Sequence, residues 1–111
     1  MLPESRPAPA REMRIHGAVV ESDLPRLSDY LQEVLSTAPE RVVVDLSTCP
    51  SLHPDAITEL VAAQGQLRTS GGVIDLRGTP ATVRAQLQDA GVDGLFTHSP
   101  AKKLARVLPL R

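Results

Sequence analysis

The feature that most constrains this chain is an alternation of extended apolar segments with helix-like segments. Residues 41–46 hold four apolar side chains in six positions without alternation, and residues 73–76 repeat this pattern in shorter form. Such runs are typical of strands that are covered on both faces in a parallel sheet. Between them, residues 54–67 carry apolar side chains at helical spacing. We therefore expect an α/β layered domain with a mostly parallel sheet and right-handed crossovers.

The rest of the chain continues the alternation and completes an expectation of about four strands and about four helices. Gly17 is expected at a bulge or at a close approach of the backbone. The remaining predicted elements are, in chain order, a strand at 13–20, a helix at 24–35, a helix between Thr79-Pro80 and Gly91, a short strand within 92–96 and a last helix opened by Ser99-Pro100.

The domain organisation follows from length and from the placement of proline. The chain has 111 residues, which suits one domain. Residues 1–11 hold three of the ten prolines and no apolar periodicity. We interpret them as a flexible proline-rich tail, followed by a single domain over residues 12–111.

Composition excludes several classes of function. The net charge is −1 and there are only two aromatic residues, so neither a basic face nor a stacking platform for nucleic acid is expected. No apolar run approaches the roughly 18 residues of a membrane span, so direct membrane insertion is not expected either. One cysteine and three scattered histidines form no disulfide or zinc spacing. We expect a cytoplasmic protein without metal or cofactor.

Four residues are candidates for a catalytic role. Asp45 and Asp75 end corresponding strands, at the edge where α/β folds form sites, although acids there commonly bind loop amides instead. Cys49 has His53 four residues further on as a potential base, but most lone cysteines are packed and inert. A small enzyme or ligand binder that uses these four residues is therefore one hypothesis. No glycine-rich nucleotide motif or nucleophile elbow accompanies them.

The segment His53-Pro54-Asp55-Ala56 lies where a loop enters the helix at 54–67. Pro54 suits the first helical position, and Asp55 places a negative charge at the positive end of the helix dipole, worth about 0.3–1 kcal/mol. Stability alone accounts for both residues.

Several stretches, taken in order, resemble the STAS domain (sulfate transporter and anti-sigma factor antagonist) over residues 13–108. Gly17 falls on the glycine of the family's early "GELD" strand. The other matching stretches are Val-Val-Val-Asp-Leu-Ser at 42–47, Leu-His-Pro-Asp-Ala-Ile at 52–57 against the family's "L-D-S-S/T-G-L", Gly-Gly-Val-Ile-Asp-Leu at 71–76, Pro-Ala-Thr-Val-Arg at 80–84 and Ala-Gly-Val-Asp-Gly-Leu-Phe at 90–96.

The resemblance implies a non-enzymatic protein-binding regulator in bacterial signalling and transcription. Family members of this size, the anti-sigma factor antagonists, bind a serine kinase that also holds a sigma factor. The unmodified domain captures the kinase and frees the sigma factor. The kinase inactivates the domain by phosphorylating the second hydroxyl residue of "D-S-S/T-G".

This chain departs from the family at that switch. Asp55 stands at the phosphoacceptor position, Pro54 at the preceding serine, His53 at the family's aspartate and Ala56 at its glycine. Asp55 carries one negative charge against about −1.5 to −2 for phosphoserine, so it either mimics the phosphorylated state or only supports the helix end. We therefore expect a degenerate phosphorylation switch.

The predicted partner-binding surface combines the switch segment with acids that follow the early strand, where the family's acid falls on Val20. Ser51 and Thr58 are the nearest remaining hydroxyl residues that a kinase could modify. The partner-binding residues are predicted to be His53, Pro54, Asp55, Ala56, Thr58, Glu21 and Asp23.

Two kinds of partner remain open. The first is an anti-sigma-type serine kinase or a related signalling protein. The alternative is a lipid or anion transport complex, in which the chain would be a STAS-type accessory subunit docked on a transport ATPase or on the cytoplasmic face of a transporter.

Overall fold

A computed structural model describes residues 10–101 of the chain. The predicted last helix beyond Ala101, and the predicted tail apart from its last two residues, lie outside the described residues. Among residues 10–101, no helix is both long and apolar enough to cross a lipid bilayer. The elements are β1 (Arg11–His16), a short 3-10 helix η1 (Glu21–Asp23), α1 (Leu24–Leu35), β2 (Arg41–Thr48), α2 (Pro54–Arg68), β3 (Val73–Arg77), α3 (Ala81–Asp89), a second 3-10 helix η2 (Asp93–Leu95) and β4 (Thr97–Ser99).

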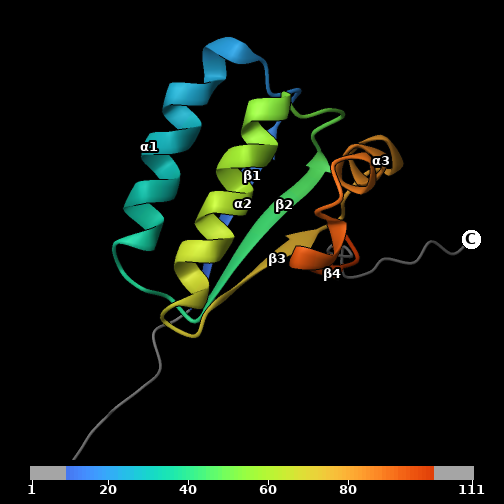
Figure 1. The fold of residues 1–111 in the computed structure, drawn as a ribbon. Coiled ribbons are helices and arrows are strands. Elements are labelled where there is room, and N and C mark those ends of the chain that lie inside the picture. Colours follow the sequence, from blue (N-terminus) through green and yellow to red (C-terminus); the bar gives the residue numbers. More distant parts are fainter. Residues whose placement is uncertain (1–9, 102–111) are drawn as a thin grey trace, which may run out of the picture.

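The four strands form one sheet in the order β1-β2-β3-β4, and every neighbouring pair is parallel (Figure 1). Each crossover runs through a helix, as parallel pairing requires. The predicted α/β class with a parallel sheet of about four strands is therefore confirmed. Three α-helices lie within the described residues.

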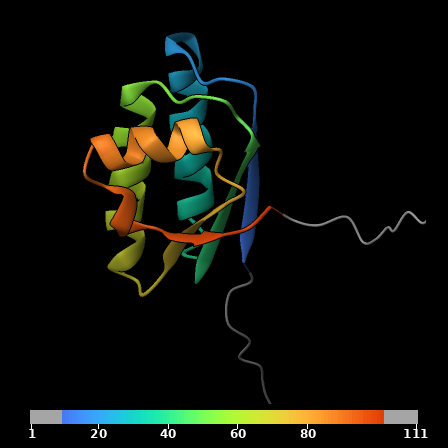
Figure 2. The same cartoon turned by 90° about the vertical axis from the view of Figure 1, so that its right-hand side faces the viewer.

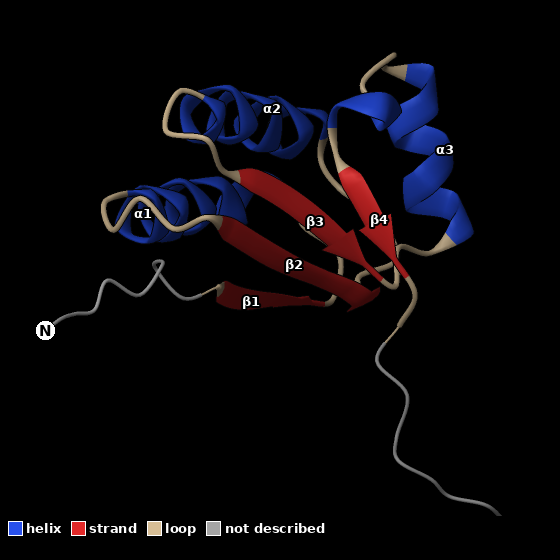
Figure 3. Ribbon diagram, turned by 90° about the horizontal axis from the view of Figure 1, so that it is seen from below, coloured by secondary structure: helices blue, strands red, loops and turns tan. Residues whose placement is uncertain are grey.

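All three helices lie on one side of the sheet, as Figures 2 and 3 show from two directions. The side chains of β2 alternate accordingly: Val42, Val44 and Leu46 point into the helix-covered core and are at most 1% exposed. No helix of residues 10–101 covers the other face, and the predicted last helix lies outside the described residues. Val43 and Asp45 are buried there without a helix above them, because long polar side chains of the neighbouring strands lie over the sheet.

Two predicted strands are displaced. The first strand ends at His16, not near residue 20, because Gly17 takes a left-handed conformation (φ 85°) and donates its N–H to the Thr48 carbonyl at 2.9 Å. The last strand is Thr97–Ser99, because residues 93–95 form a 3-10 turn instead. Ser99 consequently belongs to β4 and does not begin a helix.

Two glycines provide a matched test of packing. A Cβ atom on Gly72 would lie 2.6 Å from Leu67 Cγ and 2.7 Å from the Pro39 carbonyl oxygen, whereas one on Gly65, within α2, meets nothing within 4 Å. We expect Gly72→Ala to lower the free energy of unfolding by about 1–3 kcal/mol. Gly65→Ala is expected to raise it by about 0.5–1 kcal/mol. Urea denaturation measures both, and equal effects would contradict the packing at Gly72.

Candidate functional site

The predicted partner-binding segment lies where the loop after β2 enters α2. His53 is the N-cap residue, and its ring Nδ1 accepts a hydrogen bond from the Asp55 N–H at 3.0 Å. Pro54 is the first helical residue, as its fixed φ favours. Thr58 is exposed, and its hydroxyl lies 3.4 Å from the Pro54 carbonyl oxygen. Ala56 is fully buried, so its side chain contributes to the core and not to the surface.

Asp55 presents its carboxylate in the first turn of α2 and is exposed. His53, not Asp55, makes the capping hydrogen bond. Within residues 10–101 the Asp55 carboxylate has no hydrogen bond or ion pair that would neutralise it. Its charge therefore interacts with the helix dipole and remains open to contact from outside.

A short parallel bridge brings the η1 region beside the start of α2. Val19 pairs with Leu52, donating its N–H to the Ser51 carbonyl at 3.0 Å and accepting from the His53 N–H at 3.0 Å. The two predicted parts of the surface are thus held together by backbone hydrogen bonds. Asp23 accepts a hydrogen bond from the Val20 N–H at 2.9 Å, so its carboxylate stabilises η1.

Side chains of α3, which the sequence patterns did not predict to contribute, hold the same loop from the other side. Gln86 accepts from the Leu52 N–H at 2.9 Å and donates to the Leu52 carbonyl at 2.8 Å. Thr82 donates its hydroxyl to the Pro50 carbonyl at 2.6 Å. Gln86 directly precedes the buried Leu87 and lies three residues after the buried Val83. The position of Gln86, a polar residue at the margin of the apolar face of α3, was the only sequence signal for this contact.

An apolar cavity of about 330 Å³ opens beside the start of α2. It is formed by one face of α2 and by the turn after α3, and its lining residues are Pro54, Ile57, Thr58, Val61, Ala90 and Val92. Concave apolar sites next to polar groups are where protein partners insert their anchoring side chains. We call this cavity, together with Glu21, His53, Pro54, Asp55 and Thr58, the α2 entry surface.

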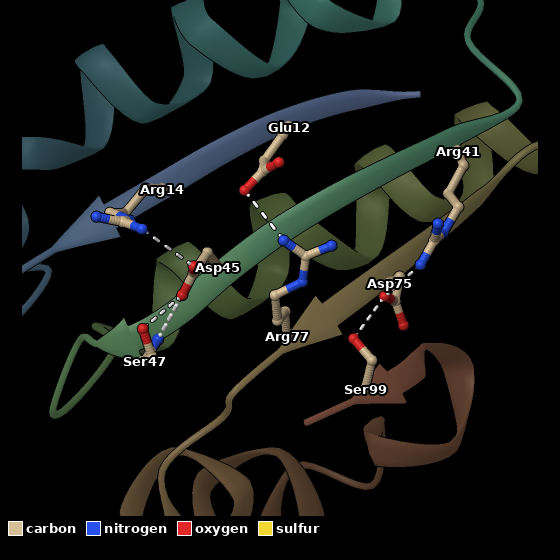
Figure 4. Close-up of polar contacts among 8 residues, drawn as sticks. All are labelled: Glu12, Arg14, Arg41, Asp45, Ser47, Asp75, Arg77 and Ser99. Carbon is tan, nitrogen blue, oxygen red and sulfur yellow. Dashed lines mark hydrogen bonds and ion pairs between the residues drawn. The ribbon is translucent and has the colours of Figure 1, made fainter. Parts of the chain in front are cut away.

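The structure does not assemble the four catalytic candidates. Cys49 is fully buried in the helix-side core, its thiol donates to the Ser51 carbonyl at 3.3 Å, and burial raises the pKa of the thiol. The His53 Nδ1 is occupied by the Asp55 amide. Asp45 and Asp75 lie on the face of the sheet that no helix of residues 10–101 covers, away from that core (Figure 4). We call this the open face.

Asp45 is 2% exposed on the open face. Burial by itself would raise the pKa of its carboxyl group. Hydrogen bonds from the Ser47 hydroxyl (2.6 Å) and the Ser47 N–H (2.9 Å), with the charges of Arg14 and Arg77, outweigh burial and lower the pKa. Asp45 therefore binds a backbone amide as expected, but that amide is the Ser47 N–H within β2 and not one in a loop.

Asp75 is 3% exposed and joins three strands of the open face. It accepts hydrogen bonds from Arg41 (2.9 Å), Thr97 (2.8 Å) and Ser99 (2.8 Å), as Figure 4 shows in part. Burial again opposes ionisation, but these three donors and the Arg41 charge more than compensate, so the pKa of Asp75 is lowered. Asp75 binds hydroxyl groups and a guanidinium, not loop amides.

Fold and site together define a class of protein: a small parallel α/β domain with an apolar cavity beside the start of one helix. Within residues 10–101, no three His, Cys, Asp or Glu side chains gather as a potential metal site. A family model described as "Mlab, STAS domain" matches residues 4–98. The chain belongs to the STAS domain family.

Solved structures agree on the fold. A sulfate transporter family protein from Wolinella succinogenes is 17% identical with a TM-score of 0.69, over 85% of this chain and 80% of that one. The anti-sigma factor antagonist SpoIIAA in its unphosphorylated form is 11% identical, also with a TM-score of 0.69, over 86% and 84%. The SulP transporter STAS domain from Vibrio cholerae is 16% identical with a TM-score of 0.64, over 87% and 77%. No curated protein sequence matches this chain significantly.

Proposed function

We propose that this chain is a cytoplasmic, non-enzymatic protein-binding regulator of the anti-sigma factor antagonist type, and that its partner docks on the α2 entry surface. The observation that carries the proposal is the exposed, unneutralised Asp55 carboxylate in the first turn of α2, directly beside an apolar cavity. The structural likeness to the anti-sigma factor antagonist SpoIIAA supports the same proposal.

The partner is proposed to be an anti-sigma-type serine kinase. Its contact region needs an apolar side chain for the cavity and a basic group for the acids around it. Glu21 and Asp55 are both exposed and both negative at pH 7. Arg and aromatic side chains are the residues most often used for such anchoring.

Filling the cavity is expected to weaken docking. Thr58→Arg places a long charged side chain into the apolar lining and should weaken binding to a co-encoded kinase of this type at least about tenfold, which is roughly 1.4 kcal/mol. Thr69→Arg makes the same change at the exposed far end of α2 and is the matched control. Titration calorimetry with the purified kinase measures both. Equal affinities for the two variants would rule out the α2 entry surface.

The state of the switch is tested by restoring a hydroxyl group. A serine kinase has no acceptor hydroxyl at residue 55 of the native chain, so no phosphate should be incorporated there. Asp55→Ser is expected to accept one phosphate per chain from the cognate kinase, measured by mass spectrometry. Asp55→Ala is the control without a hydroxyl. Modification of Ser51 or Thr58 in the native chain would instead place the switch at those residues, and no incorporation by a kinase that binds would show that the switch is lost.

A second candidate function is that of an accessory subunit in a lipid or anion transport complex. Its support is that two of the similar solved structures are described as a sulfate transporter family protein and a SulP transporter STAS domain. In that case, affinity purification should recover a co-encoded transport ATPase. The pair Thr58→Arg and Thr69→Arg applies unchanged, because the proposed docking surface is the same.

A further inference from the structure

A second cavity, of about 460 Å³, lies at the carboxyl ends of β3 and β4. Its lining residues are Gly78, Thr79, Arg84, His98, Ser99, Pro100 and Ala101, and it shares none of them with the cavity of the α2 entry surface. The volume falls within the usual range of small-molecule sites, about 300–1,000 Å³.

Two lining side chains point to the chemistry of an occupant. The hydroxyl oxygen of Thr79 is buried and forms no hydrogen bond within residues 10–101. Arg84 donates its Nε–H to Asp93 Oδ1 at 2.7 Å, which fixes the guanidinium while its two terminal nitrogens keep no partner among the described residues. The Arg84 side chain is 41% exposed, so solutes reach it. A buried polar atom without a partner costs free energy that a fitting ligand recovers.

His98 supplies the third polar atom. Its Nε2 lies 3.0 Å from the Asp93 carbonyl oxygen, so this nitrogen carries the hydrogen in the neutral ring. Asp93 Oδ1 also lies 3.3 Å from Nε2. The other ring nitrogen, Nδ1, is buried and has no hydrogen bond in the described part of the chain. In the neutral ring Nδ1 is an acceptor, and it requires a donor from the occupant.

We propose that this cavity binds inorganic phosphate. The terminal N–H groups of Arg84 and the hydroxyl group of Thr79 donate to phosphate oxygens, as guanidinium and hydroxyl groups commonly do. His98 Nδ1 accepts from a protonated phosphate oxygen. Sulfate matches phosphate in shape but carries no proton near pH 7, and a phosphate monoester, whose second pKa is about 6, has largely lost its proton at pH 7.5. The cavity therefore favours inorganic phosphate over both.

The test is an NMR-monitored titration of the full chain at pH 7.5. Inorganic phosphate, glycerol 3-phosphate and sulfate are the probes. The imidazole resonances of His16, His53 and His98 are observed together. We expect a saturable shift of the His98 signals alone, with a dissociation constant for phosphate of about 1–10 mM. Sulfate should bind at least about fivefold more weakly. Glycerol 3-phosphate should also bind more weakly than inorganic phosphate, and tighter binding of this probe would contradict the role given to His98 Nδ1.

Variants give the second readout. Arg84→Gln and Thr79→Val should each weaken phosphate binding about tenfold, because the first removes the guanidinium cation and the second removes the hydroxyl donor while keeping the size of the side chain. Arg68→Gln, which removes an exposed cation at the end of α2, should leave binding unchanged. Equal weakening by Arg84→Gln and Arg68→Gln, equal affinity for sulfate, or shifts of all three histidines without saturation would overturn the proposal. The outcome does not depend on docking at the α2 entry surface.

Discussion

Replacing Asp75 with alanine is expected to lower the free energy of unfolding by about 2–4 kcal/mol. The carboxylate is 3% exposed and accepts hydrogen bonds from Arg41, Thr97 and Ser99. Its removal leaves two hydroxyl groups and a guanidinium without their acceptor, and lost partners of buried polar groups cost about 1–3 kcal/mol each. We expect the lower part of this summed cost, because Thr97 is an exposed residue and the Arg41 side chain is 48% exposed, so both groups regain water.

Asp29→Ala is the matched control for this change, because Asp29 is exposed on α1. Its effect should stay within about 0.5 kcal/mol. Asp75→Asn should cost less than Asp75→Ala, since the amide retains one acceptor oxygen. Denaturant unfolding followed by circular dichroism provides the values. A loss for Asp75→Ala no larger than for Asp29→Ala would contradict the contacts of the open sheet face.

The same carboxylate gives the stability a dependence on pH. The pKa values of Asp45 and Asp75 are lowered in the folded state, so the unfolded chain binds more protons as the pH falls toward the usual value of about 3.9. Their stabilisation is therefore complete at neutral pH and is lost as the pH falls below about 4. In Asp75→Asn this acid-dependent loss should be smaller than in the native chain, as denaturant unfolding at pH 7 and at pH 4 would measure.

Replacing Gln86 with leucine is expected to cost about 2–4 kcal/mol and to loosen the α2 entry surface. The Gln86 amide pairs with both the N–H and the carbonyl of Leu52, a residue that is 2% exposed. Leucine keeps the side-chain volume but leaves both backbone groups unpaired, and each costs about 1–2 kcal/mol in a buried position.

Gln88→Leu makes the same exchange at an exposed position of α3 and is the control, with an expected effect below about 0.5 kcal/mol. Hydrogen exchange at the Leu52 amide reports the local consequence, which should be faster exchange in Gln86→Leu than in Gln88→Leu. Unchanged exchange at that amide would show that the Gln86 contact does not hold the loop.

Much of the fold follows from local patterns that the structure retains. Helices α1, α2 and α3 lie within one or two residues of the expected ranges, because apolar spacing and proline placement act within a few turns of chain. Pro54 begins α2 and Pro80 is the N-cap residue of α3. The two displaced strands depended on a backbone turn at Gly17 and on the 3-10 turn at residues 93–95, which apolar spacing does not encode.

The candidate site was predictable only in part. Asp55 was placed correctly in the first turn of α2 because helix starts have local signals. Ala56 was assigned to the surface although it is fully buried. The contribution of Gln86 escaped prediction, since its partner Leu52 is 34 residues away in the chain.

By itself the sequence determined the class of fold, the order of its strands and helices and its resemblance to the STAS family, because these depend on periodicity and motif spacing along the chain. Only the tertiary structure decided which face of the sheet is open and that Asp45 and Asp75 are paired on it with residues of other strands (Figure 4). It also decided that Val19 and Gln86 hold the loop before α2 from opposite sides. Such contacts join residues that are distant in the chain, and their geometry arises only when the helices pack on one face of the sheet.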